Sequence, residues 1–308
     1  MTTLSTRVSS PRAGPLRLIA ADIKLHHSVF AMPVALLAAF MAAPGKKVSD
    51  PFVRQLGLIV LAMIFARTVA MLANRLLDRR IDALNPRTAA RAIPSGRLSI
   101  RAAKIALLIC AGGFMLVCVA FGALFDNWWP AILGLPVLGW LCAYPLLKRF
   151  TSLCHLWLGA SLAISPLAAA IAINPPALVQ HPALWLLSAM VLGWVAGFDI
   201  IYALQDVQVD RTQRLFSIPS RFGVAGALWI SRGLHLAAMA CLIATWRVDA
   251  RLGAVFGIGV GITAALLAYE HATVARWGTT RMALAFFTLN GVISCVLGGL
   301  GIADVLAG

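Results

Sequence analysis

Long apolar runs separated by short polar connections form the main pattern of this sequence. Each run has about 20 residues, which is enough for an α-helix to cross the hydrocarbon core of a bilayer. A helix also satisfies its own backbone hydrogen bonds, as lipid surroundings require. The pattern predicts nine transmembrane helices in one bundle, near residues 19–43, 53–77, 102–124, 128–147, 152–174, 182–204, 223–246, 252–273 and 282–305.

Composition supports an all-α polytopic membrane protein. Of the 308 residues, 61% are hydrophobic and only 12% are charged, whereas soluble domains carry roughly 25% charged residues. This excludes soluble enzymes, secreted disulfide scaffolds and disordered chains. The runs are continuous rather than alternating, which argues against a transmembrane β-barrel. We expect a cytoplasmic tail at 1–18 and a single transmembrane domain at 19–308.

The basic residues predict the orientation in the membrane. The net charge is +15, from 26 Lys and Arg against 11 Asp and Glu. In a membrane protein such an excess reflects retention of basic loops in the cytoplasm rather than nucleic-acid binding. Twenty of the 26 fall on the side of the N-terminus and five on the other. We therefore expect a cytoplasmic N-terminus, an external C-terminus and a location in a bacterial inner membrane or its equivalent.

Five of the eleven acidic residues fall within two short stretches, 78–82 and 199–210. On an ideal helix, at about 100° per residue, Asn74, Asp78 and Asp82 form one narrow stripe with Arg67 beside it. Asp199, Asp206 and Asp210 form a second stripe within about 40°. Both stripes approach the same membrane face, so the sequence predicts two acidic helix faces that meet there.

Carboxylates one helical turn apart repel each other unless a cation lies between them. That cation can be a neighbouring Arg, such as Arg79, Arg80 or Arg211, or a divalent metal ion. Oxygen ligands from Asp and Asn suit Mg²⁺, and the absence of His from both stripes argues against Zn²⁺. The presence of two copies favours metal binding over simple helix capping.

Basic and hydroxyl side chains accompany the acids on the same side. The connection 83–98 contains Arg87, Arg91 and Arg97, and the guanidinium fork matches phosphate oxygens. Tyr144 and Lys148 end the fourth predicted span. Clustered carboxylates, Mg²⁺ and Arg are together what a diphosphate requires.

Four motifs make the chain resemble the UbiA superfamily of intramembrane aromatic prenyltransferases, in its 4-hydroxybenzoate polyprenyltransferase-like branch. They are N-x-x-x-D-x-x-x-D at 74–82, D-x-x-x-D at 206–210, N-P-R-T followed by I-P-S-G-R at 85–97, and Y-P-x-x-K-R at 144–149. The I-P-S sequence recurs at 218–220, after the second acidic motif. The resemblance covers nearly the whole chain.

The resemblance implies Mg²⁺-dependent transfer of a polyprenyl chain from its diphosphate to an aromatic acid, 4-hydroxybenzoate first among the candidates, in ubiquinone or menaquinone biosynthesis. It implies a catalytic role for Asp78, Asp199 and Asp206. By this resemblance Asn74, Asp78, Asp206 and Asp210 are expected to hold Mg²⁺, and Lys24, Arg67, Tyr144 and Lys148 to contact the diphosphate or the aromatic acid. The acidic stripe adds Asp82 to the expected metal ligands, and the basic connection adds Arg87 and Arg91 to the expected substrate-binding residues. One departure is Arg75, which stands where many members of the family carry a second acid.

Two other functional classes fit parts of the pattern. A secondary transporter also places carboxylates in spans, but near the bilayer midplane rather than at span ends. A lipid phosphotransferase also uses Mg²⁺, but this chain has no D-G-x-x-A-R sequence. The acceptor, the chain length and the oligomeric state stay open.

Overall fold

A computed structural model describes residues 18, 30–43, 45 and 49–308, and this part of the chain is helical throughout, without strands. The predicted all-α fold is therefore confirmed. The principal helices are α2 (Met32–Ala42), α3 (Asp50–Leu77), α5 (Ile100–Phe125), α6 (Trp129–Leu147), α7 (Cys154–Ile173), α9 (Ala183–Ala203), α11 (Ile218–Val248), α12 (Ala254–Trp277) and α13 (Leu289–Ala307). Shorter helical segments are α4 (Arg79–Leu84), α8 (Ala177–Gln180), η2 (Leu204–Asp206), α10 (Val207–Thr212) and the π-helical η3 (Ala283–Thr288).

Eight of the described helical segments are long and apolar enough to cross a membrane. The first predicted span, 19–43, is described only from residue 30 onward, and its helix α2 has 11 residues. The count of nine spans and the cytoplasmic N-terminus therefore remain predictions. The predicted tail, 1–18, also lies outside the described residues except for Leu18.

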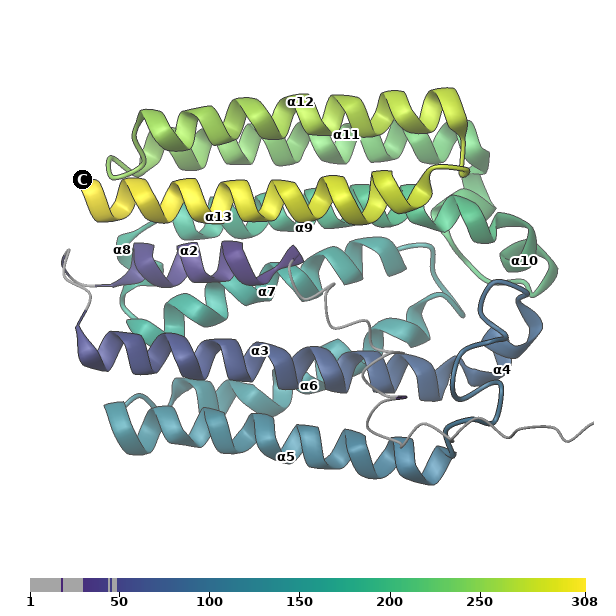
Figure 1. Ribbon diagram of the computed structural model, residues 1–308, viewed down its shortest axis with the longest axis horizontal. Coiled ribbons are helices and arrows are strands. Elements are labelled where there is room, and N and C mark those ends of the chain that lie inside the picture. The colour runs from purple at the N-terminus through teal and green to yellow at the C-terminus, as the bar shows by residue number, and fades with distance from the viewer. Residues whose placement is uncertain (1–17, 19–29, 44, 46–48) are drawn as a thin grey trace, which may run out of the picture.

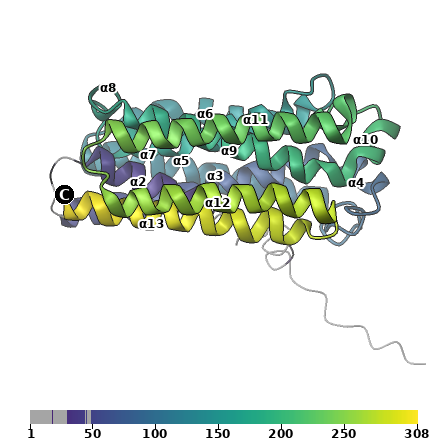
Figure 2. The same cartoon turned by 90° about the horizontal axis from the view of Figure 1, so that it is seen from above.

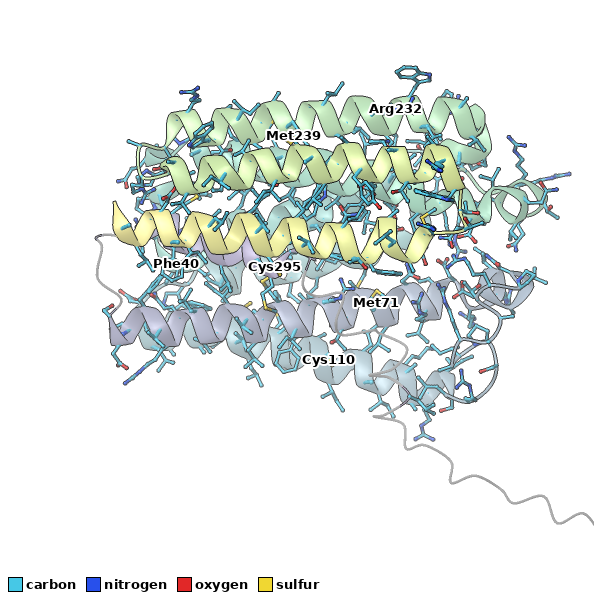
Figure 3. The ribbon with its side chains drawn as sticks, turned by 45° about the horizontal axis from the view of Figure 1, so that its top comes forward. Phe40, Met71, Cys110, Arg232, Met239 and Cys295 are labelled. Atoms are coloured by element: carbon cyan, nitrogen blue, oxygen red, sulfur yellow. The ribbon has the colours of Figure 1, made fainter. Side chains whose placement is uncertain are left out.

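The long helices lie side by side along one direction, as Figures 1 and 2 show. The short helices α4 and α10 lie together at one end of the bundle, and the C-terminus lies at the opposite end. Oxygen and nitrogen atoms lie mainly at the two ends of the bundle, whereas the middle of the helices carries mostly carbon (Figure 3). Polar side chains thus lie chiefly at span ends, as the sequence predicted.

Helix α9 is the central element and packs between α7 and α11. Two glycines one turn apart, Gly193 and Gly197, let the backbones of α9 and α11 approach closely. A Cβ atom at Gly193 would lie 2.9 Å from the Leu234 carbonyl oxygen, and one at Gly197 would lie 2.3 Å from the His235 ring. Small residues commonly allow such close packing between membrane helices. This packing fixes the helix that carries Asp199 and leads into the second acidic motif.

Candidate active site at one end of the bundle

A cavity of about 750 Å³ opens at the α4–α10 end, between the two acidic motifs. Lys24 lies outside the described residues. Every other predicted site residue lines this cavity: Arg67, Asn74, Asp78, Asp82, Arg87, Arg91, Tyr144, Lys148, Asp199, Asp206 and Asp210. Segments more than 100 residues apart in the chain therefore contribute to one site.

Each acidic motif lies at a break in its helix rather than on a continuous helical face. α3 ends at Leu77, and Asp78 takes φ −89° and ψ 3° before α4 begins. In the second copy Asp206 takes φ −107° and ψ 1° before α10 begins. Both aspartates thus share the sparsely populated bridge conformation in which many active-site residues occur. The acids of each predicted stripe still face one cavity, but the helix that carries each stripe is interrupted at the first Asp of the motif.

Cations pair with the acids of the first motif. Lys148 Nζ lies 2.6 Å from Asp78 Oδ2, and an Arg149 nitrogen lies 3.6 Å from Asp78 Oδ1. Arg91 Nη1 donates to both oxygens of Asp82 at 2.8 Å. Asp78 and Asp82 are only 2% and 5% exposed, so these cations compensate carboxylates that have lost most of their water.

Asp206, in the second motif, ties the two motifs together. Arg87, from the connection after α4, donates through Nε to Oδ1 at 3.0 Å and through Nη2 to Oδ2. Asn85 Nδ2 also donates to Oδ1, at 2.9 Å. The third guanidinium nitrogen of Arg87 donates to the Tyr202 hydroxyl at 2.9 Å. All three nitrogens of the Arg87 fork therefore have partners on the α9–η2 segment.

Burial and pairing change the pKa of Asp78 and of Arg87. Burial raises the pKa of Asp78, although the neighbouring Lys148 acts to lower it. Burial alone would lower the pKa of Arg87, but its hydrogen bond to Asp206 outweighs that effect and the pKa of Arg87 is raised. Arg87 therefore stays charged, while Asp78 takes up a proton more readily than an ordinary Asp.

The predicted metal ligands carry only oxygen donors. No group of three or more His, Cys, Asp and Glu side chains converges as a metal site in the described part of the chain. The buried Asp78 Oδ1, however, has no hydrogen-bond partner among the described residues. A buried carboxylate oxygen without a donor, beside further Asp and Asn oxygens, fits a hard cation such as Mg²⁺. Arg75, at the departure from the family pattern, is buried and donates to Asn74 Oδ1 at 3.3 Å.

An aromatic wall closes the other side of the cavity. Phe286 packs against Tyr202 with ring centroids 4.2 Å apart and against Phe198 at 5.2 Å. Phe30 and Phe287 extend the same cluster. Met71 of α3, labelled in Figure 3, is another lining residue. The cavity thus joins a charged end to an apolar end, as an amphipathic substrate with an anionic head would need.

Sequence reasoning missed three polar residues of this site. Asn85 and Tyr202 bind Asp206 and Arg87 as described above. His155 of α7 lies 2.7 Å from Asp199 through Nδ1. Tyr202 could have been found, because it lies three residues after Asp199 and four before Asp206, on the same helical face. His155 had only a weak signal, a lone histidine at the start of an apolar run.

Comparison with known proteins identifies the family. A model of the UbiA prenyltransferase family matches residues 31–300, nearly the whole chain. The chain belongs to the UbiA prenyltransferase family. It is therefore a prenyltransferase and an integral membrane protein, as the sequence motifs predicted. Membership in this family also argues against the transporter and lipid phosphotransferase alternatives.

Individual relatives agree with the family match. The 4-hydroxybenzoate octaprenyltransferase of Yersinia enterocolitica is 31% identical over 235 residues, which cover 75% of this chain and 76% of that protein. The enzyme of the same name from Xanthomonas oryzae is 29% identical over 240 residues, covering 77% and 76%.

Solved structures share the fold of this UbiA-family member. The apo structure of a UbiA homologue from Aeropyrum pernix K1 matches with a TM-score of 0.80 and 30% identity, over 91% of this chain and 98% of that chain. A UbiA homologue from Archaeoglobus fulgidus bound to DMAPP and Mg²⁺ matches with a TM-score of 0.68 and 18% identity, over 96% and 99%. The second likeness concerns the fold alone.

Proposed function

We propose that this enzyme transfers a polyprenyl chain from polyprenyl diphosphate to an aromatic acid, 4-hydroxybenzoate, in quinone biosynthesis. The observation that carries the proposal is the two-sided cavity, with clustered carboxylates and cations at one end and aromatic side chains at the other. A polyprenyl diphosphate has the matching character, because an anionic head is joined to a long apolar tail. The names of the Yersinia and Xanthomonas relatives support the choice of acceptor.

The charged end would hold the diphosphate. Asn74, Asp78, Asp206 and Asp210 would hold Mg²⁺, which supplies positive charge to the diphosphate oxygens when it is bound. Asp82 is already paired, because Arg91 binds both of its oxygens. The oxygen-only donor set supports this assignment, as does the Mg²⁺ bound to the Archaeoglobus homologue.

Basic side chains would complete the diphosphate site. Lys148 and Arg87 are now paired with Asp78 and Asp206, so their charges already lie where the leaving group would sit. Arg67 lines the same cavity, and its buried Nε has no hydrogen-bond partner in the described part of the chain. These residues would bind phosphate oxygens by charge-assisted hydrogen bonds and stabilise the negative charge that develops on departure.

The transfer itself exchanges one bond for another. The C1–O bond of the prenyl diphosphate breaks, and the diphosphate leaves with the electron pair. A carbon of the electron-rich ring attacks C1 to form the new C–C bond. The ring then loses a proton to a base, for which Asp199 is the cavity-lining candidate. The aromatic wall would shield the developing allylic cation from water and stabilise it by cation–π interaction.

A direct test is to incubate the purified enzyme with radiolabelled polyprenyl diphosphate and either 4-hydroxybenzoate or a dihydroxynaphthoate. We expect a labelled prenylated 4-hydroxybenzoate, lost with EDTA and restored by Mg²⁺. Transfer to the naphthoate alone would show that 4-hydroxybenzoate is not the acceptor and that the enzyme serves another quinone pathway. Transfer that persists without any divalent metal would refute the metal-dependent mechanism.

A further inference from the structure

A buried histidine–carboxylate pair lies beside the diphosphate end of the cavity. His155, near the start of α7, and Asp199, on α9, both line the cavity and are 4% and 8% exposed. His155 Nδ1 lies 2.7 Å from Asp199 Oδ2. Neither residue belongs to the two D-x-x-x-D motifs, and His155 contributes to no contact with the acids of the first motif.

The second ring nitrogen of His155 decides where the proton lies. The backbone N–H of Ile218 donates to His155 Nε2 at 3.3 Å. A nitrogen that accepts this hydrogen bond carries a lone pair and no proton. The proton of a neutral imidazole therefore resides on Nδ1 and is donated to Asp199. Asp199 in turn accepts this hydrogen bond through Oδ2.

The acceptor side of His155 is held by a rigid element. Ile218 is the first residue of α11 and lies within the capping box that Ser217 and Ser220 form. Ser217 Oγ also donates to Asp210 Oδ2 at 2.7 Å. A continuous path of contacts thus runs from Asp210 through the start of α11 and His155 to Asp199. Both ring nitrogens of His155 form hydrogen bonds, so the ring cannot turn without breaking at least one of these bonds.

Asp199 has one oxygen left for a ligand. Among the described residues, only His155 forms a side-chain hydrogen bond with Asp199, and it uses Oδ2. Oδ1 therefore keeps its acceptor capacity on a residue that lines the cavity. A phenolic hydroxyl is the complementary group, because it is a donor that an aromatic acceptor of the proposed reaction carries.

We propose that His155 is a positioning residue that fixes the Asp199 carboxylate, so that Oδ1 receives the hydroxyl of the aromatic acceptor. The proposal rests on the proposed function, since it assigns the acceptor's place within the same cavity. It separates the cavity into two parts: the two acidic motifs and Lys148 serve the diphosphate, and the His155–Asp199 pair serves the ring.

Two substitutions at position 155 test this role. His155→Phe keeps a ring of similar size but removes both hydrogen bonds. His155→Gln offers an amide that can donate to Asp199 and accept from Ile218. For His155→Phe we expect at least a tenfold rise in the KM for the aromatic acid or a tenfold fall in its kcat/KM. The KM for polyprenyl diphosphate should stay within about twofold, and His155→Gln should recover most of the loss.

A double-mutant cycle with Asp199→Asn separates positioning from general packing. If His155 acts through Asp199, adding His155→Phe to Asp199→Asn should cost little more than Asp199→Asn alone. Additive losses, or equal rises in KM for both substrates, would overturn the proposal, as would a folded His155→Gln as impaired as His155→Phe. If His155→Phe fails to fold, the kinetics of His155→Gln and the binding of the prenyl diphosphate decide between the outcomes.

The failure of the proposed function looks different. In that case the wild-type enzyme prenylates no aromatic acid, and no variant can be compared. If the wild type is active and the folded His155→Phe enzyme keeps its acceptor kinetics, only the role of His155 is wrong. A matched control is His181→Gln, which alters a histidine directly after α8 that does not line the cavity, and we expect unchanged KM values.

Discussion

The contacts of Arg87 make Arg87→Lys the sharpest test of the diphosphate site. The guanidinium donates to both oxygens of Asp206 and to the Tyr202 hydroxyl. A lysine keeps the charge but presents a single compact ammonium instead of a planar fork. If Arg87 only marks the cytoplasmic side of the membrane, the substitution should be silent. If its geometry matters for the diphosphate, activity should fall although the charge is unchanged.

The expected loss follows from the number of contacts. One charge-assisted hydrogen bond contributes roughly 1.5–3 kcal/mol, which corresponds to about ten- to a hundredfold in kcat/KM. The side chain of Arg87 is 32% exposed, and solvent weakens such contacts. We therefore expect a loss of about tenfold or somewhat more for Arg87→Lys, and a similar loss for Lys148→Ala.

The assay measures kcat/KM for polyprenyl diphosphate at saturating aromatic acid, together with expression and thermal unfolding. Arg54→Lys is the matched control, because Arg54 forms an ion pair with Asp50 that is 70% and 72% exposed, on the first turn of α3 and far from the cavity. Exposed pairs contribute little, so this variant should behave as the wild type. Wild-type kinetics in both Arg87→Lys and Lys148→Ala would mean that the two residues only determine membrane topology and do not bind the diphosphate.

Four further outcomes are expected. Asp78→Ala and Asp206→Ala should each lower kcat by several orders of magnitude while the protein still inserts and folds, measured by turnover and by size-exclusion profile. Burial raises the pKa of Asp78, and a protonated carboxyl cannot hold a cation. The Mg²⁺ concentration for half-maximal activity should therefore rise as the pH falls toward that pKa. A Mg²⁺ requirement that does not change with pH would contradict this. Asn290 is fully buried, accepts from the Trp194 indole at 2.6 Å and donates to two carbonyls of η3. Asn290→Leu should therefore destabilise the fold by about 1–3 kcal/mol in thermal unfolding. Glu270→Gln keeps an acceptor for Asn290 and should leave the stability unchanged. A reporter protein fused to the C-terminus should be active outside the cytoplasm, because the C-terminus lies at the end of the bundle opposite the cavity, which we expect to face the cytoplasm. A reporter active in the cytoplasm would mean that the orientation is the reverse of the one predicted.

The sequence was sufficient for the parts of the site that repeat. Two acidic motifs in a chain with few acids, each followed by an I-P-S sequence, predicted that Asp78 and Asp206 serve one site. Hydrophobic run length predicted the long helices to within a few residues, because lipid leaves the backbone few alternatives to helix. These features depend on local pattern and on charge, which a single sequence displays directly.

Other features depend on tertiary packing that no local pattern reveals. The helix breaks at Asp78 and Asp206 arise where the chain turns across the end of the bundle, and helical periodicity alone predicted continuous faces. The pairing of His155 with Asp199 joins residues 44 positions apart, so neither residue signals the other. The π-helical segment η3, which carries Phe286 of the cavity wall, likewise has no signal in the hydrophobic pattern.

The contact between α2 and α13 has a consequence for how the protein is made. Gly298 of α13 would place a Cβ atom 2.6 Å from the Pro33 carbonyl oxygen, and Ser294 donates to the Phe30 carbonyl at 2.8 Å. α2 packs chiefly on α7 and α13 and only slightly on α3, its successor in the chain.

The first long helix of the described chain therefore has a principal neighbour that is synthesised more than 200 residues later. Segments near the N-terminus generally fold first during synthesis, but α2 cannot complete its packing until α13 has entered the membrane. We expect the nascent bundle to stay open along this seam until then.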